Sequence, residues 1–197
     1  MKILVTSIKG GVGKSSIATN LAVHIDAVCV TNDLITKHSH WIHQIVTKTK
    51  RIPKEYCNID NVVFDFGAMS TNIDPKISHA IDLCDVIVIP TFTDERSLHA
   101  ALETYNLVIT RNKPVVFIIN HFTKRAKYLE AENFLTETIP SPLICAIRTT
   151  TLFDRVVRQG QEWFLDIKHA KGEYQLNKTQ LMHEIVYDTI MQEGVRH

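Results

Sequence analysis

Short runs of apolar, mostly β-branched residues recur along the chain, and they constrain its fold more than any other feature of the sequence. Each run is apolar on both faces, which is typical of parallel strands buried between two layers of helices. Between two of them, apolar residues from Leu98 to Ile109 recur at helical spacing, which predicts a strand–helix–strand unit. We therefore predict an α/β fold with a mostly parallel, open sheet and helices on both faces. The predicted strands are Ile3–Ser7, Ala27–Asn32, Val62–Phe66, Asp85–Pro90, Pro114–Asn120 and Leu143–Ile147.

The composition limits the classes of function. The 197 residues suit a single domain spanning 1–197, and the formal net charge of +1 means that nucleic-acid binding would require a local basic patch. The four cysteines form no C-x-x-C pair, which argues against a zinc site or a disulfide framework and fits an intracellular protein. The sequence has neither a signal peptide nor an apolar run near the ~20 residues that span a bilayer. We therefore expect a soluble, cytoplasmic protein.

A glycine-rich segment, KGGVGKSS, joins the first predicted strand to a helical stretch. Its glycines let backbone N–H groups converge on an anion, and the following helix adds its positive N-terminal end. We expect Lys14 to neutralise the β- and γ-phosphates of a nucleotide, the Ser15 hydroxyl to bind Mg²⁺ and Ser16 to contact the α-phosphate. The predicted phosphate-binding loop consists of Gly10, Gly11, Val12, Gly13, Lys14, Ser15 and Ser16.

This segment resembles the deviant Walker A motif, K-G-G-x-G-K-[ST], of the ParA/MinD family of P-loop ATPases. Weaker motifs of the family follow in the same order, and the resemblance covers about Met1 to Phe164. It implies a P-loop NTPase fold, ATP and Mg²⁺ as ligands, and greatest similarity to small plasmid-partition proteins of the ParA type. The further motifs are VCVTNDLIT, VVFDFGA, DVIVIPTFTDERSLHAA, FIINHF and IRTTTLFDRVVRQGQEWF.

Lys9 is a second lysine beside the loop, although binding one nucleotide's phosphates requires only Lys14. In the ParA/MinD family, the lysine at this place reaches across a dimer interface to the nucleotide of the partner subunit. The resemblance therefore implies a homodimer with two ATP molecules sandwiched between two chains, in which ATP switches dimerisation on.

The resemblance also assigns Asp33 to orient the water that attacks the γ-phosphate, which makes Lys9, Lys14 and Asp33 the predicted catalytic residues. The family pattern here is D-x-D-P, whereas this chain has Thr31 in place of the first acid and Leu34 in place of the proline. We therefore expect slow ATP hydrolysis, stimulated by a partner.

Two further residues complete the predicted site. Asp65 ends an apolar run beside the loop, where its carboxylate can hold Mg²⁺ through water. Asn120 matches the family asparagine that reads adenine, and its amide offers both a donor and an acceptor. The family closes the base pocket with the loop after the next strand, here around Ile147–Thr149.

The late region suggests what the dimer binds. It contains five basic residues, and an ATP-dependent dimer would double such a patch, giving salt-dependent, non-specific DNA binding. An ordinary solvated surface is the open alternative. The candidate DNA contacts are Arg148, Arg155, Arg158, Lys168 and Lys171.

The last predicted helix, about Lys178–Gln192, presents an apolar stripe that could lie on a membrane or pack on the core. Acidic residues on its polar face argue against anionic lipid, so we expect it to pack on the core and the protein not to bind membranes. The stripe consists of Leu181, Met182, Ile185, Val186, Thr189 and Ile190, and the predicted polar face carries His183, Glu184, Asp188 and Glu193.

Three histidines, His38, His40 and His43, lie close together near the second predicted strand. A metal site would need a further ligand at a recognisable spacing, which the sequence lacks. The solvated start of a helix explains them better.

These observations predict a small ParA-like ATPase that slowly hydrolyses ATP to drive plasmid or DNA segregation, together with a small DNA-bound partner protein. It would associate with the nucleoid if it binds DNA. The alternative is a nucleotide-dependent regulatory or assembly factor, for example in conjugative DNA transfer, which acts by binding protein and hydrolyses little ATP.

Overall fold

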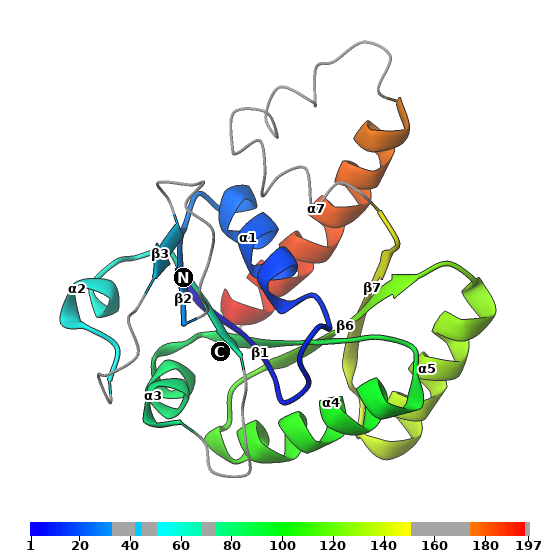
Figure 1. Cartoon of the computed structure of the whole chain (residues 1–197), viewed down its shortest axis with the longest axis horizontal. Coiled ribbons are helices and arrows are strands. Elements are labelled where there is room, and N and C mark those ends of the chain that lie inside the picture. The colour runs from blue at the N-terminus through cyan, green and yellow to red at the C-terminus, as the bar shows by residue number, and fades with distance from the viewer. Residues whose placement is uncertain (33–41, 45–50, 68–73, 151–173, 196–197) are drawn as a thin grey trace.

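A parallel sheet forms the centre of the structure. The computed structural model describes residues 1–32, 42–44, 51–67, 74–150 and 174–195. Within these ranges, strands pair in the order β3-β2-β4-β1-β5-β6-β7, and all neighbours are parallel (Figure 1). The predicted open parallel sheet is thereby confirmed. The strands are β1 (Lys2–Ser7), β2 (Val28–Thr31), β3 (Ile42–Gln44), β4 (Val62–Gly67), β5 (Val86–Thr91), β6 (Val115–Phe122) and β7 (Leu143–Arg148).

Each predicted run is a strand, with ends that differ by one or two residues, but β3 was not predicted. It pairs with β2 at the edge of the sheet, with Cys29 opposite Ile42 and Val30 opposite His43. The expectation that His43 belongs to a helix start is therefore wrong. A strand of three residues is too short to show the alternation or the apolar run by which strands are found in a sequence.

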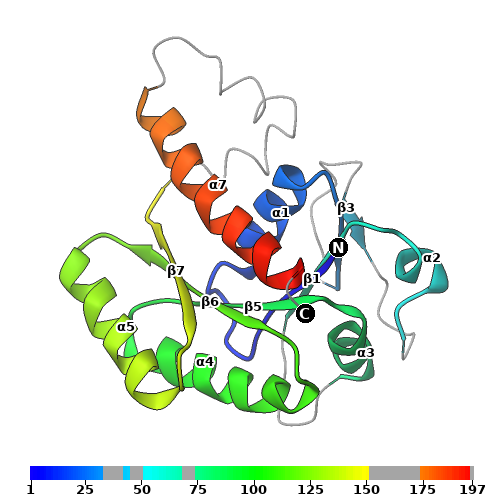
Figure 2. The ribbon, with the colours of Figure 1, turned by 180° about the vertical axis from the view of Figure 1, so that it is seen from behind.

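Helices cover both faces of the sheet (Figures 1 and 2). One layer contains α1 and α7, and the other contains α3, α4 and α5. The helices are α1 (Lys14–His24), α2 (Lys54–Cys57), α3 (Pro75–Leu83), α4 (Glu95–Val108), α5 (Arg125–Thr138) and α7 (Tyr174–Val195), and a short 3₁₀ helix, η1 (Ile109–Arg111), follows α4.

The two layers explain why the strands are apolar on both faces. In β1, Ile3 and Val5 pack in the cluster that includes α1 and α7, whereas Leu4 packs in the cluster with α3, α4 and α5. All three side chains are fully buried. Successive residues of a strand point to opposite faces, so a strand with a helix layer on each side needs no polar position.

Helix α7 packs on the core with a different face from the one predicted. Val186 and Ile190 are buried as expected, together with His183 and Tyr187. Three of the four other residues of the predicted stripe face outward: Leu181, Met182 and Ile185 are 57%, 55% and 56% exposed. The fourth, Thr189, is partly buried. Because Tyr187 buries its large ring, the contact face is centred between Val186 and Tyr187 rather than on the aliphatic residues before them.

His183 was expected on the polar face of this helix but lies in the core. Its ring is 6.1 Å from that of Tyr187, and the side chain is almost completely buried. Burial disfavours the imidazolium form and lowers the pKa of His183 to about 4. Within the described residues, no helix has the length and the apolar character needed to cross a membrane.

Candidate nucleotide-binding site

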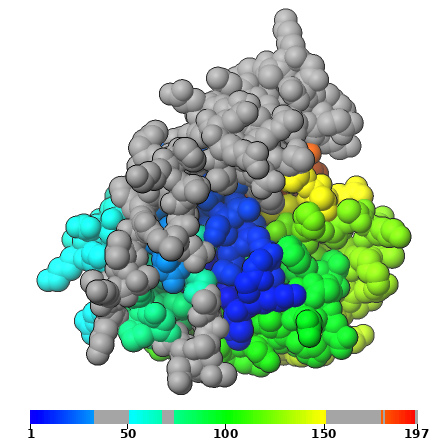
Figure 3. Space-filling view, viewed as in Figure 1, coloured from blue at the N-terminus to red at the C-terminus, as the bar shows by residue number. Residues whose placement is uncertain are grey.

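The glycine-rich loop lies at the carboxyl edge of the sheet, between the end of β1 at Ser7 and the start of α1 at Lys14. From β1 the chain first builds β2, β3 and β4 on one side, and then crosses to β5 on the other. Open α/β sheets bind ligands at such a switch point, outside the carboxyl ends of their strands. The space-filling view shows the N-terminal segment at the surface, next to the segment that carries α4 (Figure 3).

A cleft of about 410 Å³ opens over this loop. The loop forms most of its wall, and the end of β4 supplies the rest. The cleft therefore combines most of the predicted phosphate-binding residues with a neighbouring strand. Its lining consists of Gly10, Gly11, Gly13, Lys14, Ser15, Ser16 and Gly67.

Two glycines of the loop have backbone conformations that would be strained for other residues. Gly11 and Gly13 have φ angles of 77° and 86°, in the left-handed region that favours glycine. A Cβ atom on Gly13 would also lie 2.4 Å from Nδ2 of Asn120, far inside van der Waals contact. The backbone conformation therefore favours glycine at position 13, and a larger residue there would also displace the Asn120 side chain.

The start of α1 is suited to an anion. Gly13 is its N-cap and offers no side chain to cap it, and the first turn carries no acidic residue. The first backbone hydrogen bond of α1 runs from the Ile17 amide to the Gly13 carbonyl oxygen, at 3.0 Å. The amides at the beginning of α1 are the orphan donors of a helix N-terminus, where the helix dipole also favours negative charge.

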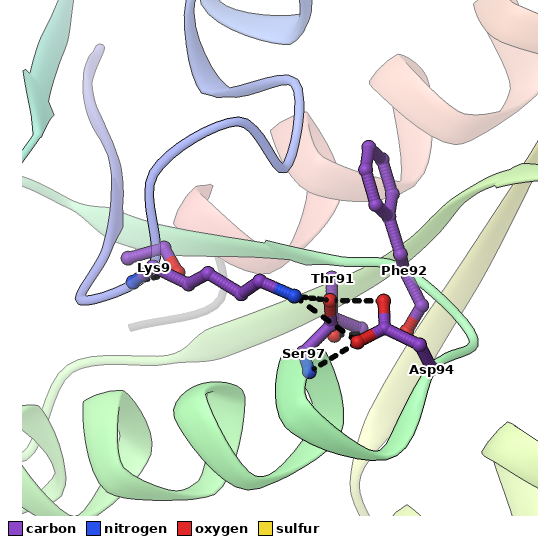
Figure 4. A network of polar contacts seen from close by, with 6 residues as sticks. Lys9, Thr91, Phe92, Asp94 and Ser97 are labelled. Carbon is purple, nitrogen blue, oxygen red and sulfur yellow. Dashed lines mark hydrogen bonds and ion pairs between the residues drawn. The ribbon is translucent and has the colours of Figure 1, made fainter.

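The two lysines point in different directions. The Lys14 side chain lines the cleft, where it is largely buried and donates a hydrogen bond from Nζ to the Lys9 carbonyl oxygen, at 3.1 Å. Lys9 instead extends to the start of α4, where Nζ lies 3.0 Å from Oδ1 of Asp94 and 2.7 Å from Oγ of Ser97 (Figure 4). Nothing in the sequence marked Asp94 or Ser97 as neighbours of Lys9.

Asp65 lies within β4 and not at its end as predicted, because the strand continues to Gly67. Its side chain is 1% exposed, and its Oδ2 accepts a hydrogen bond from the Thr31 hydroxyl at 3.2 Å. Thr31 occupies the place of the first acid in the resembled motif, and a carboxylate there would repel that of Asp65. The neighbouring Asn32 accepts from the Gly67 amide at 3.3 Å, which ties the ends of β2 and β4 together.

Asn120 lines a second, smaller pocket of about 190 Å³ that shares Gly13 and Ser16 with the phosphate-loop cleft. Its Nδ2 donates to the Val12 carbonyl oxygen at 3.4 Å, so it contacts the loop directly. The register of β6 and β7 shifts between Asn120 and Phe122, and a bulge of this kind redirects side chains. The complete lining consists of Gly13, Ser16, Phe92, Asn120, His121, Arg148 and Thr150.

Four of these pocket residues were not assigned to it from the sequence. The rings of Phe92 and His121 lie 5.6 Å apart, and His121 adopts a φ of 57° at the bulge. Arg148 and Thr150 come from the end of β7 and the loop after it, a region that the resemblance had named without choosing a residue. His121 could have been predicted from its place in the motif FIINHF, directly after Asn120, whereas no sequence feature placed Phe92 in this pocket.

Comparison with models of protein families gives no match, and comparison with curated protein sequences also gives none. Solved structures do match over nearly the whole chain. MinD from Pyrococcus horikoshii OT3 has a TM-score of 0.63 at 12% identity, covering 100% of this chain and 98% of that one. A putative plasmid partition protein from Borrelia burgdorferi B31 has a TM-score of 0.59 at 14% identity, with 96% and 99% covered.

The chain has the fold of the ParA- and MinD-type ATPases. A third similar structure is a variant of Cyanothece McdA in complex with ATP, with a TM-score of 0.60 at 12% identity over 98% of this chain and 96% of that one. The B. burgdorferi protein was solved with AMPPNP and the P. horikoshii MinD with Mg-ADP. Proteins with this ParA/MinD-type fold thus include several that bind adenine nucleotides.

The remaining predicted residues are only partly described. Arg148 donates from Nη2 to the Thr123 carbonyl oxygen at 3.0 Å and lies in the wall of the Asn120 pocket. Asp33, the predicted water-orienting residue, lies outside the described ranges, as do the histidines at 38 and 40 and the four other candidate DNA contacts, Arg155, Arg158, Lys168 and Lys171. In the part of the chain that is described, no three His, Cys, Asp or Glu residues form a group that could hold a metal ion.

Proposed function

We propose that this chain is an ATPase that binds Mg-ATP over the glycine-rich loop and dimerises around it. The observation that carries the proposal is the start of α1, which combines two left-handed glycines, no side-chain cap and no acid in its first turn. This arrangement supplies backbone donors and positive potential at one point, and it suits a polyphosphate.

The phosphates are held by the loop amides and by Lys14, and the Ser16 hydroxyl contacts the α-phosphate. Ser15 and Asp65 are the residues that would hold Mg²⁺, because a hydroxyl and a carboxylate are the hard oxygen donors that this ion prefers. An Mg²⁺ ion held by these residues would neutralise part of the phosphate charge. The hydrogen bond from Thr31 keeps the Asp65 carboxylate oriented without adding a second negative charge.

Adenine occupies the smaller pocket beside the loop. Phe92 and His121 give this pocket ring surfaces, and Asn120 provides an amide for the edge of the base. The pocket shares Gly13 and Ser16 with the cleft, so one nucleotide can extend from base to phosphates across both.

Dimerisation follows from Lys9, which reaches the nucleotide of the partner subunit while Lys14 serves its own. The γ-phosphate charge is then shared by two chains, and hydrolysis removes the attraction that holds them together. Asp33 orients the attacking water, and the phosphate oxygens are stabilised by both lysines and the loop amides as charge develops. Turnover is slow because Thr31 lacks the carboxylate that the resembled motif has at this position.

The dimer binds DNA without sequence preference through the basic residues of the late region, and a small DNA-bound protein stimulates it in plasmid or DNA segregation. One observation favours a second function: Thr31 stands where the resembled motif has an acid, and weak hydrolysis suits a regulatory or assembly factor that acts by binding protein. Such a factor would respond to bound ATP and would not depend on its hydrolysis.

A gel mobility shift with random-sequence DNA separates these two functions. The segregation function predicts a shift that requires ATP and Mg²⁺ and weakens steeply as salt rises, because DNA binding by basic side chains releases counterions. No shift at low salt with ATP present would contradict DNA binding and favour the regulatory factor. Lys14→Ala serves as the control without nucleotide binding.

A further inference from the structure

The end of β4 is joined to the end of β2 by a side chain rather than by backbone pairing. The two strands pair as far as Thr31 opposite Asp65, where β2 ends. Two residues further along β4, the Gly67 amide donates a hydrogen bond to Oδ1 of Asn32 at 3.3 Å. Gly67 is buried, and a buried amide requires an acceptor. The Asn32 side chain supplies the acceptor that a longer β2 would have provided.

Gly67 also forms part of the wall of the phosphate-loop cleft. Among the described residues, it is the part of the cleft lining that lies outside the glycine-rich loop. It is opposite Ser7 in the pairing of β4 with β1, next to the point where the chain enters the loop. A glycine at the end of a strand lets a ligand approach the backbone closely, because it has no Cβ atom. The Gly67 amide is therefore a donor at the edge of the proposed phosphate site.

The arrangement of the two pockets indicates which phosphate lies near Gly67. The smaller pocket, proposed for adenine, and the cleft share Gly13 and Ser16, so these two residues mark the end of the cleft nearest the base. Ser16 is also the proposed contact of the α-phosphate. Gly67 lines the cleft but is not in the lining of the adenine pocket that the described residues form. The terminal phosphate of a triphosphate is therefore the group that reaches Gly67.

The hydrogen bond to Asn32 is weak enough for a phosphate to replace it. Its length of 3.3 Å exceeds the usual N–H···O distance of about 2.9–3.0 Å, and the Asn32 side chain is neutral and partly exposed. A phosphate oxygen is charged, and charge-assisted hydrogen bonds are roughly twice as strong as neutral ones. A γ-phosphate in the cleft and the Asn32 side chain therefore compete for one N–H group, whereas a diphosphate leaves that group to Asn32.

We propose that Asn32 is a specificity-determining residue, whose side chain competes with the γ-phosphate for the Gly67 amide and so limits how strongly the site prefers ATP over ADP. This inference rests on the proposed function, in which the cleft holds the phosphates of ATP. The resembled motif, D-x-D-P, leaves the position of Asn32 open, so the competing side chain is a feature of this chain.

Two substitutions of Asn32 separate this competition from a merely structural role. Asn32→Ala removes the competing acceptor, so the ratio of the AMPPNP affinity to the ADP affinity is expected to rise about two- to threefold, the effect of a weak neutral hydrogen bond. Asn32→Asp keeps an acceptor and adds negative charge, so the ratio is expected to fall about five- to tenfold. If Asn32 only joined the two strands, Asn32→Ala would weaken the binding of both nucleotides alike and Asn32→Asp would change little.

Both affinities are measured by calorimetric titration with Mg²⁺ in a Lys9→Ala background, so that dimerisation does not add to the affinity for AMPPNP. Asn133→Asp is the matched control, because it makes the same change of charge at an exposed residue of α5 that is not in the described lining of the cleft. It is expected to leave the ratio unchanged. An unchanged ratio for both Asn32 variants, shifts of the same sign, or an equal shift for Asn133→Asp would overturn the inference.

A second readout follows the Gly67 amide itself. The chain has seven glycines, so ¹⁵N-glycine labelling gives a simple amide spectrum, in which Gly67→Ala identifies the Gly67 resonance. Without nucleotide, Asn32→Ala is expected to shift this resonance, because the amide loses its acceptor. In the wild type, AMPPNP is expected to shift it more than ADP does.

The outcomes distinguish this inference from the proposed function. A Gly67 resonance that Asn32→Ala leaves unmoved, or that shifts equally with both nucleotides, would overturn the inference even if the chain binds ATP. A wild-type chain that binds neither nucleotide would overturn the proposed function, and the inference with it.

Discussion

At the scale of single residues, the site depends on a few positions whose chemistry leaves little freedom. Gly13 is the strongest case, because its φ of 86° is strained for other residues and a Cβ atom there would collide with the Asn120 side chain. Gly10 in the same loop has a different environment, since a Cβ atom added there would meet nothing within 4 Å. Gly10 is therefore a suitable control position for a substitution at Gly13.

We predict that Gly13→Ala lowers the free energy of unfolding by about 2 kcal/mol, since a left-handed alanine costs ~1 kcal/mol and the contact with Asn120 adds to it. The same variant loses binding of a fluorescent ATP analogue, because the contact is relieved only if the loop or the Asn120 side chain moves, and both line the proposed nucleotide site. Urea unfolding and a binding titration measure the two effects. Gly10→Ala is expected to unfold like the wild type, and equal destabilisation by both variants would contradict this account.

The sequence revealed the phosphate loop but not its neighbours, for a physical reason. Contiguous residues with fixed spacing form the loop, so the spacing alone identifies it. Asp94 and Ser97 reach Lys9, and Phe92 reaches His121, only through the order of strands and the bulge in β6. Contacts that depend on how distant segments pack leave no periodicity in the sequence.

At the scale of elements, α7 is where the sequence and the structure differ most. The aliphatic stripe was readable from Leu181 to Ile190, but the buried face follows Tyr187 and His183, which carry polar groups. An amphipathic pattern counts these side chains as polar, although each ring is largely apolar and can be buried. The strands were easier to predict, because helices on both faces make nearly every position in them apolar.

Burial of His183 in α7 predicts a dependence of stability on pH. Its pKa is lowered to about 4 in the folded protein, whereas an unfolded chain has the ordinary value near 6.5. Between these values the unfolded chain binds more protons, so stability is present above pH 6.5 and decreases as the pH falls towards 4. The expected loss is about 3 kcal/mol across this window.

Urea unfolding at several pH values between 4 and 7 measures this loss. His183→Leu, which cannot titrate, is expected to have a flatter profile than the wild type. His99→Gln, at a side chain that is 58% exposed on α4, is expected to retain the wild-type slope. A slope for His183→Leu equal to that of the wild type would show that another group causes the loss.

At the scale of the whole molecule, the order of strands brings the residues with proposed roles to one edge of the sheet. β1, β4 and β5 lie side by side, so the loop after β1, the Asp65 strand and the start of α4 after β5 meet there. The similar solved structures share this fold at identities of 12% to 14%. Fold class could therefore be predicted from the pattern of runs, whereas the arrangement around Lys9 required coordinates.

The central claim is that ATP joins two chains through Lys9, and sedimentation velocity with AMPPNP and Mg²⁺ tests it most directly. The account predicts a two-subunit species for the wild type with nucleotide, and a single subunit without it. Lys9→Ala is expected to bind the nucleotide through Lys14 and still sediment as a single subunit. A wild-type chain that stays a single subunit at high protein concentration with saturating AMPPNP, or a Lys9→Ala variant that dimerises as well as the wild type, would contradict it.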